Sequence, residues 1–177
     1  MNIFISGGCK NGKSMYAQNA ARDMASDQEA PLYYLATMIP ADEEDRARIA
    51  RHLSEREGWG FETIEQGREI LRALDRADTG GVFLLDSVTA LLSNEMFLPD
   101  GSVDLTAGER LCEELSAFAE KTGNTVFVSD YIYSDSRIFD VYTEQYRQAL
   151  AMIDRRLAQV CERVTEVAFS HLYQYKQ

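Results

Sequence analysis

The fold is decided by one stretch near the start of the chain, Gly7-Gly8-Cys9-Lys10-Asn11-Gly12-Lys13-Ser14. The apolar run 2–6 precedes it with the profile of a buried strand, and a helical pattern follows from Lys13 to about Met24. Glycines allow tight turns in which successive backbone N–H groups converge, and the positive end of the helix dipole adds to their field. The spacing therefore predicts a loop that cradles phosphate groups, in the strand-to-helix context that this motif requires.

Two side chains of the loop have expected chemical roles. We expect Lys13 to reach the β- and γ-phosphates of a nucleotide and to act in catalysis, and the Ser14 hydroxyl to bind Mg²⁺. Because the backbone of the whole loop would face the phosphates, every residue of it is a predicted nucleotide contact: Gly7, Gly8, Cys9, Lys10, Asn11, Gly12, Lys13 and Ser14.

Strand and helix patterns alternate along the rest of the chain. Further strands are predicted at 32–36, 61–64, 82–85, 125–128 and 164–169, and further helices at about 42–55, 66–75, 88–96, 105–121 and 142–160. This alternation is typical of an α/β protein whose mainly parallel sheet is covered by helices on both faces, here of the P-loop NTPase type. With no repeat and no linker, residues 1–177 are predicted to form a single domain.

Composition narrows the class of protein. The chain has 177 residues, 45% hydrophobic and 27% charged, as in ordinary globular proteins. Its net charge of -11 argues against nucleic acid as a partner, because binding a phosphate backbone needs a basic surface. The three cysteines are scattered, and we find neither a signal peptide nor an apolar stretch of ~20 residues. We therefore expect a cytoplasmic protein without a membrane span.

A second acidic group near the metal is usual in phosphoryl transfer, and Asp86 is the obvious candidate. It ends the apolar strand 82–85, which we expect to lie beside the first strand. An acid at the carboxyl end of a parallel strand faces the crevice where ligands bind in open α/β sheets. We predict that Asp86 binds nucleotide and Mg²⁺ together with Ser14. The alternative is a helix N-cap, because a helix follows at once.

The chain has two histidines, and they lie in different surroundings. His171 is in the C-terminal segment, where a surface or strand position is expected. Four arginines of this otherwise acidic protein lie near His52, namely Arg46, Arg48, Arg51 and Arg56. On a helix Arg48, His52 and Arg56 share a face, where the cations would favour neutral imidazole and would bind phosphates. The alternative is a solvated helix in which acidic residues pair with the arginines.

In this order the motifs resemble the adenosylcobinamide kinase/adenosylcobinamide-phosphate guanylyltransferase family of cobalamin biosynthesis. After the phosphate loop the matching segments are Leu35-Ala36-Thr37, Asp42 to Asp45, Arg48-Ile49-Ala50-Arg51-His52 through Arg56, Trp59, Thr63-Ile64-Glu65, Leu84 to Thr89, and Asn94. The match covers about the first hundred residues, and the order of the segments makes it specific.

The resemblance implies a two-step transferase. In the first step a kinase would phosphorylate adenosylcobinamide with ATP or GTP. In the second, His52 would take GMP from GTP and pass it to the cobinamide phosphate, splitting one difficult transfer into two easier ones. Thr37, Arg48 and Arg56 are expected to contact nucleotide. The resemblance further implies small-molecule nucleotide and corrinoid substrates and a homo-oligomer, with a trimer as the expected assembly.

The second half of the chain departs from the family pattern. Where the family commonly has Asn-Glu-Val-Gly after the fourth strand, this chain has Asp130-Tyr131-Ile132-Tyr133. Two alternatives therefore stay open. One is a P-loop kinase of another small molecule without the guanylyl step, favoured by Tyr131 and Tyr133. The other is a non-catalytic nucleotide-binding protein, which would need a damaged phosphate or metal site.

Overall fold

The computed structural model describes residues 1–56, 58–133 and 136–176, and for residues 44, 48, 51–53 and 55 it describes the backbone only. Within these residues one sheet holds the strands in the order β3-β2-β4-β5-β1-β6-β7. Strands β1 to β6 pair in parallel, whereas β7 is antiparallel to β6. The strands are β1 (Ile3–Gly7), β2 (Leu32–Ala36), β3 (Glu62–Glu65), β4 (Val82–Asp86), β5 (Thr125–Asp130), β6 (Arg163–Ala168) and β7 (His171–Lys176).

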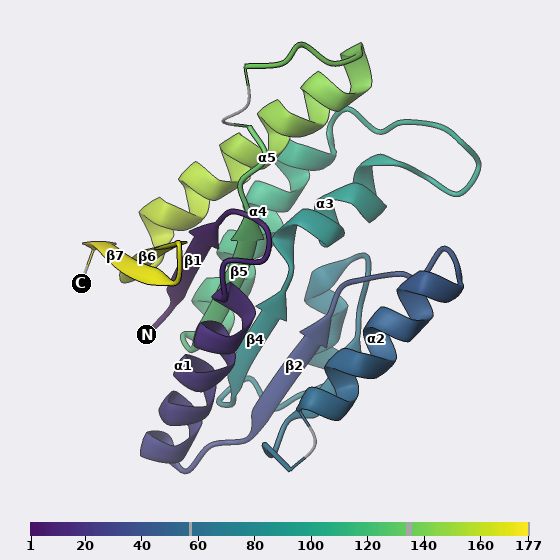
Figure 1. The fold of residues 1–177 in the computed structure, drawn as a ribbon. Helices are drawn as coiled ribbons and strands as arrows, with labels where there is room; N and C mark the ends of the chain where they lie inside the picture. Colours follow the sequence, from purple (N-terminus) through teal and green to yellow (C-terminus); the bar gives the residue numbers. More distant parts are fainter. Residues whose placement is uncertain (57, 134–135, 177) are drawn as a thin grey trace.

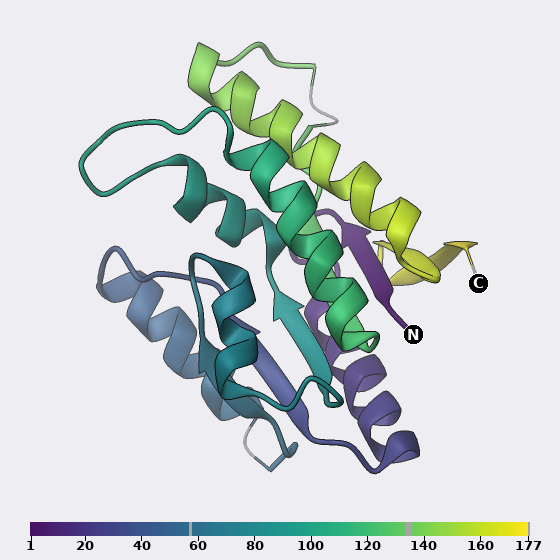
Figure 2. The same cartoon turned by 180° about the vertical axis from the view of Figure 1, so that it is seen from behind.

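Helices cover both faces of the sheet, as the sequence predicts (Figures 1 and 2). Helices α1 and α2 lie on the face that is in front in Figure 1, and the other helices lie on the face seen in Figure 2. They are α1 (Lys13–Gln28), α2 (Glu43–Glu55), the 3₁₀ helix η1 (Ile70–Arg76), α3 (Val88–Met96), α4 (Ala107–Thr122) and α5 (Val141–Val160).

Two apolar cores follow from the alternation of side chains along the buried strands. Ile5, Leu84 and Val126 pack beneath α1, against small helix residues such as Ala17 and Ala21. Their strand neighbours, among them Leu85 and Phe127, point to the other face and pack against α3, α4 and α5. Because both faces are covered, the central strands carry apolar side chains on both faces, which is why short uninterrupted apolar runs mark them in the sequence.

The sequence predicts that the strand ending in Asp86 lies beside β1, and this prediction is wrong. Strand β5 lies between β1 and β4, with Ile3 opposite Val126 and Phe83 opposite Thr125. Both β4 and β5 contain an apolar run of four residues or nearly so, Val82 to Leu85 and Val126 to Val128, so the pattern of either strand fits the place beside β1. Only the packing of the helices against the sheet decides between them.

Two further expectations need correction. The segment predicted as a helix over 66–75 is a loop followed by the 3₁₀ helix from Ile70, because Glu69 adopts a left-handed conformation with φ of 49° that starts the helix late. The chain also continues beyond β6 into β7, which the sequence does not predict. Every side chain of β7 is exposed, so no buried face imposes a pattern of apolar residues on it.

Candidate active site

The phosphate loop joins β1 to α1 as predicted, and two glycines explain its shape. A side chain at Gly7 would place its Cβ 2.4 Å from the carbonyl oxygen of Val167 on the neighbouring strand, so only glycine fits there. Gly12, the residue before α1, has φ of 88°, which glycine adopts without strain. No side chain caps α1, so the loop presents the backbone amides of the first helical turn to a ligand.

Lys13 projects from the first turn of α1 and is almost fully buried. Its Nζ donates to the Gly8 carbonyl oxygen and to Oδ1 of Asp130, each at 2.6 Å. The Lys13 side chain is 6% exposed, against 34% for that of Asp130. Asp130 ends β5, the strand beside β1, and the sequence analysis missed it. The available signal was the same as for Asp86, a carboxylate at the end of an apolar run.

Asp86 lies at the end of β4, and its carboxylate accepts a hydrogen bond of 3.2 Å from the Tyr34 hydroxyl. The alternative as a helix N-cap is not realised, because Ser87 caps α3 and accepts from the Ala90 N–H at 3.2 Å. The Ser14 hydroxyl and the Asp86 carboxylate are oxygen donors of the kind that Mg²⁺ takes. Among the described residues no three His, Cys, Asp or Glu gather at one metal site. This donor set fits a cation held mainly by nucleotide phosphates and water.

Thr37 is fully buried and joins the carboxyl ends of β2 and β4. Its hydroxyl accepts from the Ser87 N–H at 2.7 Å and donates to the Ser87 carbonyl at 2.8 Å. The Asn94 amide of α3 donates to the carbonyl oxygens of Thr37 and Gly67, at 2.7 and 2.9 Å. Three loops at the edge of the sheet are thus held at fixed distances. The predicted contact between Thr37 and nucleotide stays a prediction.

Arg56, which follows α2, is 7% exposed and stacks on the ring of Tyr34, with its guanidinium carbon 3.5 Å from the ring centroid. Burial and the charge of Asp86 raise the pKa of Tyr34, so its hydroxyl stays protonated and can donate. The side chains of Arg48 and His52, two predicted site residues on α2, lie outside the described residues. Among the described side chains of this helix, Glu43 forms one of the predicted acid–arginine pairs with Arg46, and both side chains are exposed.

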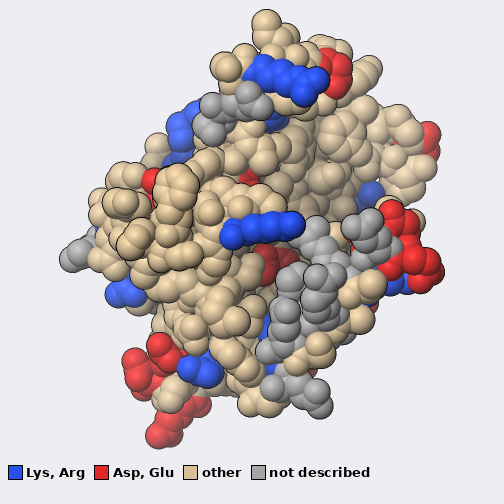
Figure 3. Space-filling view, in the orientation of Figure 1, with Lys and Arg blue, Asp and Glu red and all other residues tan. Residues whose placement is uncertain are grey.

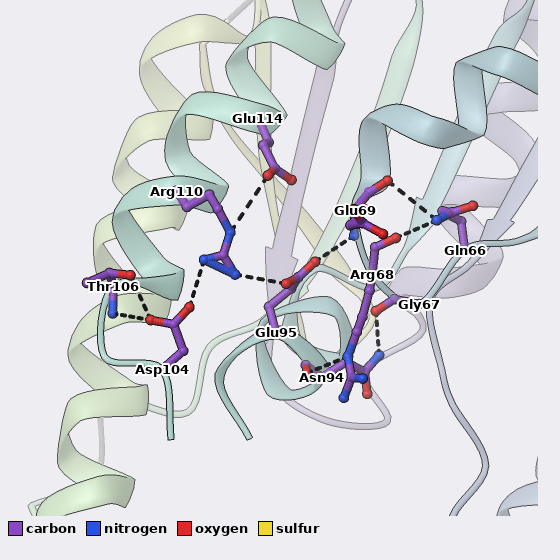
Figure 4. A network of polar contacts seen from close by, with 10 residues as sticks. All are labelled: Gln66, Gly67, Arg68, Glu69, Asn94, Glu95, Asp104, Thr106, Arg110 and Glu114. Atoms are coloured by element: carbon purple, nitrogen blue, oxygen red, sulfur yellow. Dashed lines mark hydrogen bonds and ion pairs between the residues drawn. The ribbon is translucent and has the colours of Figure 1, made fainter. Parts of the chain in front are cut away.

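A polar network outside the phosphate loop holds the segment after β3 (Figure 4). Glu95, at the end of α3, accepts from the Glu69 backbone N–H at 2.6 Å and from Arg110 of α4 at 2.9 Å. Arg110 also bonds Asp104 at 2.8 Å. Arg68 donates to the Asn94 carbonyl oxygen at 2.8 Å. Since the Glu95 side chain is only 8% exposed, this pairing compensates the burial of its charge and fixes the loop that carries Gly67.

A third carboxylate lies near the end of β5 and was not predicted. Asp154 of α5 is 4% exposed and accepts from the Tyr133 hydroxyl at 2.9 Å. Burial raises the pKa of Asp154 to about 6. Its position in the middle of a charged helix gives no sequence signal, because only the packing of α5 on the sheet buries it.

The surface between α1 and α2 is hollowed. Figure 3 shows acidic atoms at the floor of a hollow in the middle of this face, with a basic side chain lying across its rim. The phosphate loop, the end of β4 and the end of β5 all open toward the carboxyl edge of the parallel strands. In open α/β sheets this edge is where ligands bind.

The fold and this site define a P-loop nucleotide-binding protein. Two solved structures share the fold. The ATPase domain of G40P has a TM-score of 0.50 and 13% identity, covering 93% of this chain and 68% of that chain. The flagellar accessory protein FlaH from Methanocaldococcus jannaschii has a TM-score of 0.52 and 14% identity, covering 99% of this chain and 77% of that chain.

Sequence comparison narrows the class to one family. The model of the cobinamide kinase / cobinamide phosphate guanyltransferase family matches residues 3–171, so the chain belongs to that family. The bifunctional adenosylcobalamin biosynthesis protein CobP of Pseudomonas aeruginosa is 27% identical over 166 residues, covering 93% of this chain and 91% of that protein. The resemblance of the first hundred residues is thereby confirmed and extends into the second half. The protein is an enzyme of cobalamin biosynthesis with kinase and guanylyltransferase activity.

In the described residues no helix is long and apolar enough to cross a membrane.

Proposed function

We propose that the chain carries out both transfers at one site region, with His52 as the covalent carrier of GMP. In the first step the hydroxyl of the aminopropanol arm of adenosylcobinamide attacks the γ-phosphorus of ATP or GTP, and the nucleoside diphosphate leaves. In the second step a ring nitrogen of His52 attacks the α-phosphorus of GTP. The N–P bond forms as the P–O bond to the β-phosphate breaks and pyrophosphate leaves. A phosphate oxygen of the cobinamide phosphate then attacks the same phosphorus and releases His52.

The observation that carries this proposal is that Asp86 and Asp130 end neighbouring strands at the sheet edge where the phosphate loop lies, with Lys13 of the loop paired to Asp130. Lys13 supplies a cation beside the loop amides, where it can stabilise charge on transferring phosphates. Asp86 and Ser14 would hold Mg²⁺, which would supply positive charge that offsets part of the charge on the phosphates. With these groups intact, the alternative of a non-catalytic nucleotide-binding protein has no structural support.

The family assignment argues against the other alternative, a kinase without the guanylyl step, and covalent labelling tests whether His52 carries the GMP in that step. Purified protein is incubated with Mg²⁺ and GTP labelled at the α-phosphate, and protein-bound label is measured after alkali and after acid. A phosphoramidate on histidine survives alkali and is lost in acid. We expect wild type to retain alkali-stable label and His52→Ala to retain none.

The chain offers a matched control, because it has only two histidines and His171 is exposed on β7. His171→Ala should label as wild type does. Label lost in His171→Ala but kept in His52→Ala would contradict the proposal, and so would folded wild type that binds GTP and takes no label. Transfer of the γ-phosphate to cobinamide, measured in the same samples, tests the kinase step separately.

We further propose one domain over residues 1–177, a homo-oligomer with the trimer as the expected state, and a cytoplasmic location. The unpaired cysteines Cys9, Cys112 and Cys161 suit a reducing compartment. Light scattering coupled to size exclusion would measure the mass of the assembly.

A further inference from the structure

Tyr34 contacts both Asp86 and Arg56. It lies on β2 and is 6% exposed. Its hydroxyl donates to Oδ2 of Asp86 at 3.2 Å. The guanidinium of Arg56 covers its ring at 3.5 Å, and Phe61 meets the ring edge-on, with the centroids 6.0 Å apart. A single side chain thus joins the end of β4 to the residue that follows α2.

The pairing of β2 with β4 explains how the Tyr34 hydroxyl comes to lie at the Asp86 carboxylate. Strands β2 and β4 are parallel, with Tyr34 opposite Leu84 and Ala36 opposite Asp86. Side chains two residues apart on a strand point to the same face, so Asp86 shares the face of Leu84 and Tyr34. A tyrosine two positions before the end of β2 can therefore extend along the sheet and place its hydroxyl at the carboxylate.

The stack on the Tyr34 ring stabilises the buried charge of Arg56. In the described part of the chain, the Nε and Nη1 atoms of Arg56 are buried without a hydrogen-bond partner. An aromatic face attracts a guanidinium most strongly when water is excluded. The Tyr34 ring consequently holds the C-terminal end of α2 against the sheet, four residues beyond the position of His52.

We propose that Tyr34 is a positioning residue that orients Asp86 for the metal ion and docks the helix carrying His52. The inference rests on the proposed function. Its first half concerns the metal: carboxylates that bind metals are themselves held by hydrogen bonds, and losing such a partner typically weakens metal binding ~10-fold to ~100-fold. Its second half concerns α2, because a displaced helix moves the group that must attack the α-phosphorus, and small displacements slow such attacks strongly.

The first half is tested by metal binding and not by turnover. Binding of Mn²⁺ to the complex of protein and ADP is measured by electron paramagnetic resonance. We expect Tyr34→Phe, which keeps the ring, to weaken Mn²⁺ binding about 10-fold while ADP affinity without metal stays as in wild type.

Tyr33→Phe is the matched control. Tyr33 is the neighbour on the same strand, is equally buried, and points to the opposite face, where its hydroxyl accepts from the Asp78 N–H at 3.1 Å. The substitution removes one hydroxyl hydrogen bond from β2 without touching Asp86, so Mn²⁺ binding should be unchanged. Equal Mn²⁺ affinities for Tyr34→Phe and Tyr33→Phe would overturn the first half.

The second half is tested by removing the ring. At saturating metal, the rate of GMP labelling of the protein is compared with the rate of phosphate transfer to cobinamide. We expect Tyr34→Leu to lower labelling about 10-fold further than phosphate transfer, whereas Tyr34→Phe changes the two equally. Tyr33→Leu, with thermal unfolding measured for both leucine variants, controls for the general loss of an aromatic residue. An equal fall of both rates in Tyr34→Leu would overturn the docking of α2.

Failure of the proposed function is distinguishable from failure of this inference. If Asp86→Asn leaves Mn²⁺ binding unchanged, the predicted metal site is wrong. If Asp86→Asn weakens it and Tyr34→Phe does not, only the inference is wrong. If wild type takes no label at all, the carrier histidine fails while the Mn²⁺ measurement still decides the first half.

Discussion

The ends of β4 and β5 are alike in sequence and differ in what their aspartates contact. Val82–Asp86 and Thr125–Asp130 are both apolar strands that end in aspartate at the same edge of the sheet. Asp86 accepts from the neutral hydroxyl of Tyr34, whereas Asp130 pairs with the buried ammonium of Lys13. A similar motif thus gives one carboxylate a hydrogen bond from a neutral hydroxyl and sets the other against the cation of the phosphate loop. The neighbouring strand decides which, because β5 adjoins β1 and β4 adjoins β2.

The largest expected effect is that of Asp86→Asn. If this carboxylate holds Mg²⁺, its loss removes several kcal/mol of transition-state stabilisation, so kcat/KM of the kinase step should fall ~100-fold or more. Asp86→Glu keeps the charge and should retain most activity. Steady-state phosphate transfer to cobinamide measures both variants. An Asp86→Asn variant within tenfold of wild type would mean that β4 does not carry the metal ligand, and the contrast with β5 would disappear.

Asp130→Asn should lower the stability of the protein without nucleotide and raise its affinity for ADP. Without nucleotide, it leaves the Lys13 ammonium buried without its partner, which should lower the free energy of unfolding by about 2 kcal/mol, less than for a fully buried pair because Asp130 is partly exposed. With nucleotide, Lys13 no longer has to leave a carboxylate to reach the phosphates, so ADP should bind several-fold more tightly. Urea unfolding and calorimetric titration with ADP measure the two effects.

The exposed pair of Glu43 and Arg46 provides the control for Asp130→Asn. Both side chains are more than half exposed, so Glu43→Gln should change the free energy of unfolding by less than about 1 kcal/mol. Weaker ADP binding by Asp130→Asn would show that Asp130 assists the nucleotide instead of competing for Lys13.

A third aspartate, Asp154, differs from Asp86 and Asp130 in that it should make the stability of the protein depend on pH. Its folded-state pKa of about 6 lies above the ordinary 3.8, so the folded protein binds this proton more tightly than the unfolded chain does. The contribution of this group to stability is therefore complete below about pH 4 and is lost as pH rises to about 6. Asp154→Asn should remove that loss and stabilise the protein at pH 8 by up to about 3 kcal/mol. Urea unfolding between pH 4 and 8 measures it, and parallel pH curves for variant and wild type would contradict the assignment.

The smallest expected effect concerns the start of α3. Ser87 provides the N-cap, so Ser87→Ala should lower the free energy of unfolding by about 1 kcal/mol, the usual value for a lost cap. Asp86→Glu should leave the cap intact. A Ser87→Ala variant as stable as wild type would contradict the stabilising role of the Ser87 cap and would favour the alternative in which Asp86 caps α3. Thermal unfolding at constant pH is sufficient to measure the difference.

Much of the fold follows from local pattern. The loop from Gly7 to Ser14, the strand before it and the helix after it were predicted because their signals lie within one stretch of chain. The parallel sheet with helices on both faces was predicted from the alternation of apolar runs and helical periods. The segment 66–69 was not, because the left-handed Glu69 depends on Glu95, which lies 26 residues further along the chain and accepts from its N–H.

The candidate site was predicted in part for the same reason. Lys13, Ser14 and Asp86 carry their own local signals, and the order of motifs over about the first hundred residues, from Gly7 to Asn94, indicated the family that the comparisons then established. Asp130, Tyr34 and Asp154 were missed, because each is defined by a partner far along the chain. Tyr33 and Tyr34 are the same residue type, and the face of the sheet to which each points, with the partners found there, distinguishes them.

By itself the sequence determined that this is a P-loop nucleotide-binding α/β protein and indicated its family, because a phosphate loop and the periods of strands and helices are properties of neighbouring residues. The order of strands, the burial of Lys13 against Asp130 and the stack of Arg56 on Tyr34 were decided only by the tertiary structure. Several assignments of strands to places satisfy the same apolar pattern, and the burial of side chains between sheet and helices selects one of them. The selected order of strands in turn determines which side chain each of Asp86 and Asp130 contacts.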